Sequence, residues 1–289
     1  MGTTMRALVE GRGLLEAARW YPEHGLLFSD MHLGGVHRFD PATGGTDVVI
    51  PHRKGIGGLV AHRDGGLVVA GRNVAHKNGG LTATILEKRA DEQFFNDLTA
   101  DDTGRLYVGS VATDPTGDEP RGFGRLYRID LDGTCEVLAE DVMVSNGLGV
   151  DPADEVLYHV DSPRRTVWAY PTRGPSGDRR MFADTGEYGG VPDGLAVADD
   201  GSVWVAMAGG GVVVGWDAAG ERIAEIPVPQ QLVTSVCYGG EDGRTLFILT
   251  GANDEHPDPL GGSLYAHPGD RRGLPAPRAA VSGRLVGTP

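Results

Sequence analysis

The stretch Arg105–Ser110 (RLYVGS) is typical of a short β-strand, and five further stretches of the chain resemble it in pattern. The six stretches are Gly25–Asp30 (GLLFSD), Gly66–Gly71 (GLVVAG), Arg105–Ser110, Val156–Asp161 (VLYHVD), Ser202–Met207 (SVWVAM) and Thr245–Thr250 (TLFILT). They recur at intervals of about 40 to 50 residues, which is the repeat length of a propeller blade. The spacing therefore predicts an all-β fold, a six-bladed β-propeller.

Turn signals precede each stretch and a second strand-like element follows it, as expected for blades of four antiparallel strands around a central channel. The turn signals include Asp101-Asp-Thr-Gly104 and Asp151-Pro-Ala-Asp154. In the second repeat we assign Ala83–Ala90 as the third strand, which leaves residues 71–82 as a long loop. The whole chain, residues 1–289, is expected to form a single propeller domain.

One repeat position, 14 or 15 residues before the end of each stretch, is almost uniformly an oxygen donor. This position holds Glu16, Gly57, Asn96, Asn146, Asp193 and Ser235. Equivalent positions of a cyclic repeat face the same axis, so four of these side chains are expected to gather at one mouth of the channel. Asn146 and Asp193 each precede a glycine, and a role as turn formers is the alternative for both.

Composition limits the partners and the compartment. The chain has 289 residues and a net charge of −14, without a basic cluster, so neither nucleic acid nor an anionic membrane is an expected partner. No apolar run is long enough for a signal peptide or a membrane span, which predicts a cytoplasmic protein. Cys135 and Cys237 are expected to be reduced and buried, whereas the oligomeric state is left open.

Five stretches in succession resemble the SMP-30/gluconolactonase/LRE-like family. They are Leu15–Trp20 (LEAARW), Phe95–Asp97 (FND), Ser145–Leu148 (SNGL), Pro192–Val197 (PDGLAV) and Thr234–Gly240 (TSVCYGG). The resemblance implies a six-bladed propeller that binds one divalent cation, commonly Ca²⁺ or Zn²⁺, and hydrolyses lactones. By resemblance, Glu16, Asn146 and Asp193 are the metal ligands, Asp193 is also the general base, and Asn96 contacts substrate or a metal-bound water.

The donor chemistry agrees with this reading. Two carboxylates and an amide carbonyl form a hard, all-oxygen site that suits Ca²⁺, Mg²⁺ or Mn²⁺ better than a His or Cys site would. Such a cation polarises a carbonyl and acidifies water, so hydrolysis of a lactone or ester is the simplest use. Phosphoester hydrolysis, a lyase or isomerase reaction, and a non-catalytic calcium-stabilised scaffold are the alternatives.

The substrate residues are expected around the same mouth. Phe94 stands where sugar-lactone members of the family usually carry Arg, which indicates a more apolar lactone or ester. By resemblance Asp114 is an acidic substrate contact. Arg72, His32 and His76 follow strand ends that are expected at this mouth, and each is a candidate substrate contact.

Overall fold

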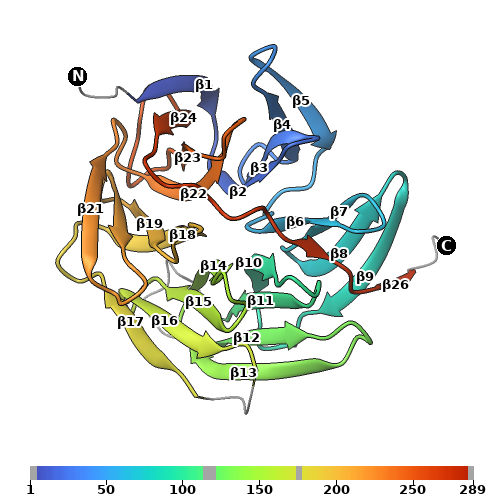
Figure 1. The fold of residues 1–289 in the computed structure, drawn as a ribbon. Coiled ribbons are helices and arrows are strands. Elements are labelled where there is room, and N and C mark those ends of the chain that lie inside the picture. The colour runs from blue at the N-terminus through green and yellow to red at the C-terminus, as the bar shows by residue number, and fades with distance from the viewer. Residues whose placement is uncertain (1–4, 113–121, 174–177, 286–289) are drawn as a thin grey trace.

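The computed structural model describes residues 5–112, 122–173 and 178–285, and within them the regular elements are β-strands. Six antiparallel sheets stand around a central channel, each with its first strand innermost (Figure 1). The predicted all-β, six-bladed propeller is confirmed. In this described part of the chain no helix is long and apolar enough to cross a membrane.

The blades follow one another along the chain, and in blades 1 to 5 the innermost strand comes first and is followed by its three partners. Blade 1 holds β2 (Leu15–Tyr21), β3 (Gly25–Asp30), β4 (Val36–Asp40) and β5 (Gly45–Ile50). Blade 2 holds β6 (Leu59–His62), β7 (Leu67–Val69), β8 (Asn73–Asn78) and β9 (Leu81–Glu87). Blade 3 holds β10 (Phe94–Ala100), β11 (Leu106–Val111), β12 (Gly124–Ile129) and β13 (Cys135–Val142).

The second half of the ring repeats this pattern. Blade 4 holds β14 (Ser145–Val150), β15 (Val156–Asp161), β16 (Thr166–Pro171) and β17 (Arg180–Asp184). Blade 5 holds β18 (Val191–Val197), β19 (Val203–Ala208), β20 (Val212–Trp216) and β21 (Arg222–Pro227). Blade 6 holds β22 (Val233–Gly239), β23 (Thr245–Thr250), β24 (Gly262–Pro268) and, from the N-terminal end of the chain, β1 (Arg6–Arg12).

The turn signals form the inner hairpins because their aspartates bind the backbone of the turn. Asp101 Oδ1 accepts the backbone N–H groups of Thr103, Gly104 and Arg105 between β10 and β11. Asp151 Oδ1 accepts those of the two residues that lead into β15. These short side chains replace the hydrogen bonds that a tight turn would otherwise lack.

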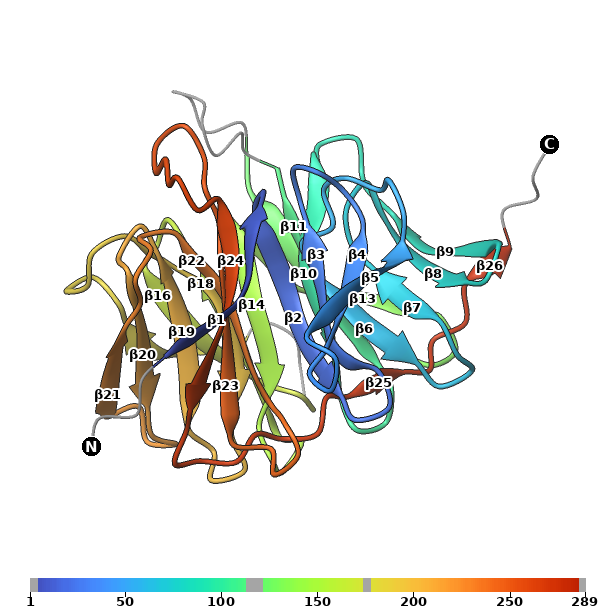
Figure 2. The ribbon, with the colours of Figure 1, turned by 90° about the horizontal axis from the view of Figure 1, so that it is seen from above.

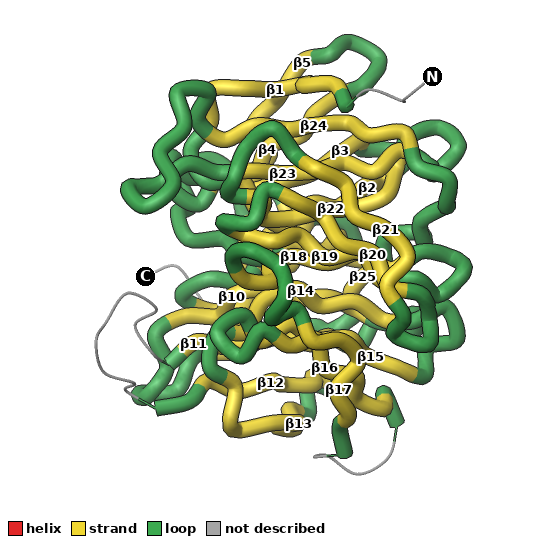
Figure 3. Tube along the Cα trace, turned by 90° about the vertical axis from the view of Figure 1, so that its left-hand side faces the viewer, coloured by secondary structure: helices red, strands yellow, loops and turns green. Residues whose placement is uncertain are grey.

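The core lies between the blades. Six buried apolar clusters are found among the described residues, one for each pair of neighbouring blades. Phe28 and Phe247, for example, pack together between blades 1 and 6. The sheets are stacked face to face around the ring, as the side view shows (Figure 3). Burial on both faces fixes the inner strands in place, so that the side chains at their ends are held rigidly.

Both ends of the chain close the ring. Strand β1 pairs antiparallel with β24, and the C-terminal segment crosses one face of the disc to add two short strands to blade 2 (Figures 1 and 2). These are β25 (Arg278–Ala279), parallel to β6, and β26 (Arg284–Leu285), antiparallel to β9. We call the end of the channel where the inner strands begin the donor mouth, and the end crossed by residues 274–279 the tail mouth.

Two sequence predictions are wrong at this level. Ala83–Ala90 does not form the third strand of blade 2, because β8 (Asn73–Asn78) takes that place and most of the segment lies in β9. Gly79 and Gly80 join these strands in a tight hairpin, so the long loop over 71–82 does not exist. Cys135 is exposed at the start of the outer strand β13, whereas Cys237 is buried as expected.

Candidate functional site

A β-bulge marks the donor position in three neighbouring inner strands. In β10, Asn96 and Asp97 lie between the pairs Phe95–Ser110 and Leu98–Val108, so two residues face one on β11. The same register shift follows Ser145 in β14, where the bulge includes Asn146. It also follows Pro192 in β18, where the bulge includes Asp193. A bulge re-aims the side chain that it carries, and here it does so at equivalent places around the channel.

Strand β2 carries its bulge directly after Glu16. Ala17 and Ala18 lie between the pairs Glu16–Ser29 and Arg19–Leu27, and Ala17 has a φ of 60°. Positive φ is unfavourable for a residue with a Cβ atom, by roughly 1–2 kcal/mol. The backbone therefore carries local strain at the residue next to the Glu16 carboxylate.

Glycines after the donors let the inner strands approach one another closely. A Cβ atom on Gly147 would lie 2.6 Å from the carbonyl oxygen of Asp193, and one on Gly194 would lie 2.8 Å from Cα of Ser235. Strands β14 and β18 could not keep their positions if these glycines carried side chains. The Asn-Gly and Asp-Gly pairs thus serve strand packing within bulges, and the alternative that they form hairpin turns is wrong.

Gly57 occupies the donor position of blade 2 for a related reason. A Cβ atom there would lie 2.3 Å from Oδ1 of Asn96 and 2.9 Å from the backbone oxygen of Asn96. Blade 2 thus contributes space in place of a side chain, and the Asn96 amide fills that space.

A chain of hydrogen bonds connects three blades at the donor mouth. The Asn96 amide Nδ2 donates to Asn146 Oδ1 at 2.9 Å and to the backbone oxygen of Ser145 at 2.8 Å. Asn146 Nδ2 donates in turn to Ser162 Oγ at 3.0 Å, and Ser162 donates to the backbone oxygen of Pro192 at 2.6 Å. The network orients both amides and ends at the residue before Asp193.

The charges of three carboxyl groups, those of Glu16, Asp97 and Asp193, influence one another, and Arg19 pairs with Asp97. Burial, followed by the charges of Asp193 and Asp97, holds the pKa of Glu16 well above its ordinary range. Burial and the charge of Asp97 do the same to the pKa of Asp193. Burial raises the pKa of Asp97 to about 6, against the opposing effect of Arg19, whose Nη2 lies 3.7 Å from Asp97 Oδ1.

These features fit a hard divalent cation. Asp193 is 7% exposed, and within the described residues no donor reaches its Oδ1 atom. Asp97 is already committed, because its oxygens accept the backbone N–H groups of Leu98 and of Leu148 in the next blade. Of the three carboxylates, Glu16 and Asp193 would therefore be the ones available to a cation.

The other residues predicted for the site lie in loops, within strands or outside the described part of the chain. His32 and Arg72 are exposed in the loops after β3 and β7, on the side of the donor mouth. Phe94 is half-buried where β10 begins, whereas Phe95 is fully buried in the core between blades 2 and 3. Asp114 lies outside the described residues.

His76 is not at the donor mouth. It lies within β8, its ring stacks on His62 with the centroids 4.0 Å apart, and its Nε2 is 2.8 Å from the backbone oxygen of Gly65. Gly65 belongs to the hairpin between β6 and β7, which is at the tail end of the blade. The expectation failed because it rested on a loop over 71–82 that is strand in the structure.

Ser162 and Arg19 are the residues that the sequence reasoning did not assign to the site. Ser162 donates to the backbone oxygen of Pro192, and it accepts a hydrogen bond from the Asn146 amide, which holds that amide in place. Arg19 is buried and donates to the backbone oxygens of Ala18 and Leu98. Arg19 could have been found from the sequence, because it is a charged residue in an inner strand, three positions after Glu16. Ser235 at the sixth donor position accepts the Ala18 N–H and joins blade 6 to blade 1.

Comparison with known proteins places the chain among its relatives. Residues 14–252 match the family model of the SMP-30/gluconolactonase/LRE-like region. The chain belongs to this family. A pentonolactonase, XacC, of Haloferax volcanii is 33% identical over 87% of this chain and 86% of its own length. A 6-deoxy-6-sulfogluconolactonase of Pseudomonas putida is 32% identical over 92% of this chain and 95% of its own.

Solved structures of the SMP-30/gluconolactonase/LRE-like family's fold superimpose over nearly the whole chain. A luciferin-regenerating enzyme gives a TM-score of 0.86 at 20% identity and covers 96% of this chain and 99% of its own. A calcium-binding regucalcin from Agrobacterium tumefaciens gives 0.83 at 22% identity and covers 96% and 98%. At these identities the likeness concerns the fold. The names of the sequence relatives are those of lactonases, which is consistent with a hydrolytic enzyme.

Proposed function

We propose that this protein hydrolyses a lactone or a related ester at the donor mouth, with a divalent cation held by Glu16, Asn146 and Asp193. The observation that carries the proposal is the buried Oδ1 of Asp193, which no donor among the described residues satisfies. A buried, unsatisfied carboxylate oxygen is costly unless it has a functional partner. The lactonase names of the two sequence relatives support the same reaction class.

The donor set favours calcium as the cation. Glu16, Asn146 and Asp193 offer only oxygen atoms, which calcium, magnesium and manganese accept readily, while zinc more often takes nitrogen and sulfur. When bound, such a cation polarises a carbonyl group and lowers the pKa of water. It would also offset the repulsion between the Glu16 and Asp193 carboxylates, which is part of the cause of the raised pKa of Glu16.

The chain's own residues supply the proton transfer and the positioning. Asp193 accepts the proton of the attacking water and returns it to the leaving alkoxide oxygen as the ring opens. Asn96 lies beside Asn146 and donates to its Oδ1, and its role is to contact the substrate or a cation-bound water. The fixed hydrogen bonds of both amides keep this geometry without reorganisation during the reaction.

Phe94 supports a substrate with an apolar part. It stands two residues before Asn96, and its neighbour Phe95 is buried in the blade core. Successive strand residues point to opposite faces, which leaves the Phe94 ring on the side away from that core. We propose that the ring covers an alkyl or aryl substituent of the lactone.

The test is a turnover assay with a paired set of lactones, one alkyl-substituted and one derived from a sugar acid. Hydrolysis above the uncatalysed rate should be lost in excess chelator and return on addition of Ca²⁺, Mg²⁺, Mn²⁺ or Zn²⁺. Turnover that is insensitive to chelator would contradict the cation site. Tight cation binding without turnover on any lactone or ester would favour a non-catalytic scaffold.

A further inference from the structure

A cavity lies at the tail mouth, at the opposite end of the channel from the donor residues. Its volume is about 490 Å³, within the usual range for small-molecule pockets. Inner-strand ends of several blades form its sides, and the C-terminal segment around Pro275 and Pro277 covers it. Arg19 lines this cavity and pairs with Asp97, so the pair separates it from the donor mouth.

Hydrogen bonds from several blades hold the C-terminal segment over this cavity. Tyr21 Oη donates to the backbone oxygen of Pro277 at 3.0 Å, and the Arg63 N–H donates to that of Ala279 at 2.9 Å. The Ala280 N–H donates to the backbone oxygen of Gly104 at 2.9 Å. The roof is thus part of the ordered fold, and it runs along the lower face of the disc in Figure 2.

Most of the wall of this cavity is apolar. Side chains from three different segments offer partly exposed apolar surface to it, namely Val150, Ala196 and Leu274. They come from blades 4 and 5 and from the C-terminal segment. A hydrocarbon body of a ligand would remove this apolar surface from water, which favours binding.

The three arginines of the cavity already have partners. Arg19 faces Asp97, and Arg278 forms an ion pair with Glu23. Arg63 donates to the backbone oxygen of Asp102 at 2.6 Å. None of these cations is therefore well placed to bind an anionic ligand.

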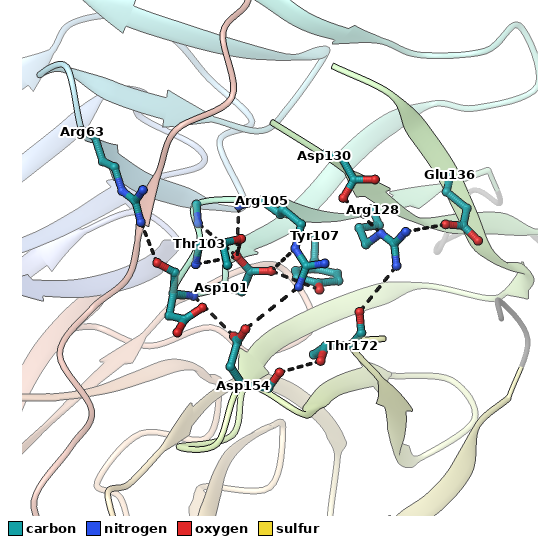
Figure 4. A network of polar contacts seen from close by, with 12 residues as sticks. Arg63, Asp101, Thr103, Arg105, Tyr107, Arg128, Asp130, Glu136, Asp154 and Thr172 are labelled. Carbon is teal, nitrogen blue, oxygen red and sulfur yellow. Dashed lines mark hydrogen bonds and ion pairs between the residues drawn. The ribbon is translucent and has the colours of Figure 1, made fainter. Parts of the chain in front are cut away.

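The acidic residues of the cavity differ in how far they are satisfied (Figure 4). Asp101 is saturated, because Oδ1 accepts backbone and hydroxyl donors of the hairpin and Oδ2 accepts Arg105 Nε at 2.5 Å. Asp154 is 7% exposed, and among the described residues no hydrogen-bond donor reaches its Oδ2. Arg105 Nη2 forms a long ion pair with this oxygen, at 4.0 Å, which is beyond hydrogen-bond distance.

Asp102 lies against Asp154 and adds a second carboxylate at this edge of the cavity. The Asp102 N–H donates to Asp154 Oδ1 at 3.3 Å. Burial, with the adjacent Asp102, raises the pKa of Asp154 to about 6. Two neighbouring carboxylates, one of them buried with an unsatisfied oxygen, favour a positively charged partner.

A metal ion alone does not account for this site. Asp101, Asp102 and Asp154 lie close enough together to hold an ion, but Asp101 has no free acceptor capacity. The two remaining carboxylates are too few for calcium, which takes six to eight oxygen ligands. The cavity is also far larger than an ion and is mostly apolar at its wall.

We propose that the tail-mouth cavity binds a small organic cation, in which a primary ammonium group lies between Asp102 and Asp154 and a short hydrocarbon body covers Val150, Ala196 and Leu274. The ammonium donates to the free Oδ2 of Asp154, and the hydrocarbon displaces water from the apolar wall. This site is separate from the donor mouth and does not depend on the reaction proposed there.

The test is a calorimetric titration of the full chain with hexylamine, and with hexan-1-ol and hexanoate as matched neutral and anionic probes. Hexylamine should bind at least tenfold more tightly than either, with and without saturating Ca²⁺. Asp154→Asn should weaken hexylamine at least tenfold and leave the weak binding of hexan-1-ol unchanged. Asparagine suits this position because it tolerates the positive φ of 58° and can still accept the Asp102 N–H.

Two further variants locate the site. Ala196→Phe places a ring at the half-buried wall of the cavity and should abolish hexylamine binding. Glu221→Gln removes an exposed carboxylate in the turn before β21 and should leave hexylamine affinity unchanged. Equal affinities for hexylamine and hexan-1-ol, or an Asp154→Asn variant that binds hexylamine as wild type does, would overturn the proposal. Displacement of hexylamine by Ca²⁺ would overturn it in favour of a cation site at Asp154.

Discussion

Asn96 and Asn146 are joined side chain to side chain across the boundary between blades 3 and 4, with Asn96 Nδ2 2.9 Å from Asn146 Oδ1. The second amide is fixed from the other side, because its Nδ2 donates to Ser162 Oγ. Without Ser162 the Asn146 amide could rotate and present nitrogen where the proposed site needs oxygen. A hydroxyl that touches neither cation nor substrate thereby controls a ligand.

We expect Ser162→Ala to weaken cation affinity by about tenfold to a hundredfold, as loss of a supporting hydrogen bond does in other metal sites. Calcium titration calorimetry measures this directly. Ser202→Ala is the matched control, because Ser202 is an equally buried hydroxyl that binds Trp204 and Asp200 in blade 5. Equal cation affinity in the two variants would mean that Ser162 does not orient Asn146.

Gly57→Ala should disturb the site from blade 2. The added methyl group would lie 2.3 Å from Asn96 Oδ1, so the amide has to leave its present position beside Asn146. We expect lower kcat/KM and a melting temperature lower by a few degrees, since overpacking typically costs about 1–3 kcal/mol. Gly80→Ala has open space around it and should change neither quantity. Wild-type turnover in Gly57→Ala would show that the position of Asn96 is not critical.

Much of the architecture was predictable because each blade repeats the same strand and turn chemistry. Asp101 and Asp151 bind the backbone of their hairpins, and such turns can be recognised in a sequence. The third strand of blade 2 was not predictable in this way. Its sequence, Asn73–Asn78, alternates poorly and is rich in polar residues, so only pairing with both neighbours makes it a strand.

The candidate site was predictable in its residues but not in its geometry. The repeat position identified Glu16, Asn96, Asn146 and Asp193, because cyclic symmetry makes sequence-equivalent positions neighbours. The bulges that aim these side chains depend on pairing between strands, which no single strand sequence specifies. The hydrogen bond from Asn146 to Ser162 crosses from β14 to the end of β15 and is visible only in the fold.

Phe94→Arg tests whether the ring at the start of β10 selects the substrate. Burial of a phenyl-sized surface is worth roughly 1.5–3 kcal/mol, or about a tenfold to hundredfold preference in kcat/KM for an alkyl-substituted lactone. We expect the variant to shift this ratio toward glucono-δ-lactone. Leu81→Arg, at an exposed position of β9, controls for the added charge. A wild type that already prefers the sugar lactone would contradict this role of Phe94.

His159 should make the fold acid-sensitive. Burial lowers the pKa of His159 to about 3, and its Nε2 is 2.8 Å from Ser145 Oγ. The folded protein thus keeps this ring neutral while the unfolded chain protonates it below about pH 6.5, so stability falls as the pH drops from 6.5 toward 3. The raised pKa of Asp97 changes the stability in the opposite direction with pH. Because Asp97 is present in both wild type and variant, its effect cancels when the two proteins are compared.

The comparison is urea unfolding of wild type and His159→Gln between pH 7 and 4. Relative to the variant, wild type should lose up to about 1.4 kcal/mol in the free energy of unfolding for each pH unit below 6.5. Parallel curves across this range would mean that His159 is protonated in the folded protein.

The most direct test of the proposed reaction is kcat/KM of Asp193→Asn on a lactone that the wild type hydrolyses. Asparagine keeps the size of the side chain but cannot accept the proton, so kcat/KM should fall by about 10² to 10⁴. Asp217→Asn, in a turn of the same blade, is the control and should keep wild-type turnover. Calcium binding and melting temperature confirm that both variants remain folded. A folded Asp193→Asn variant with kcat/KM within tenfold of wild type would contradict the account.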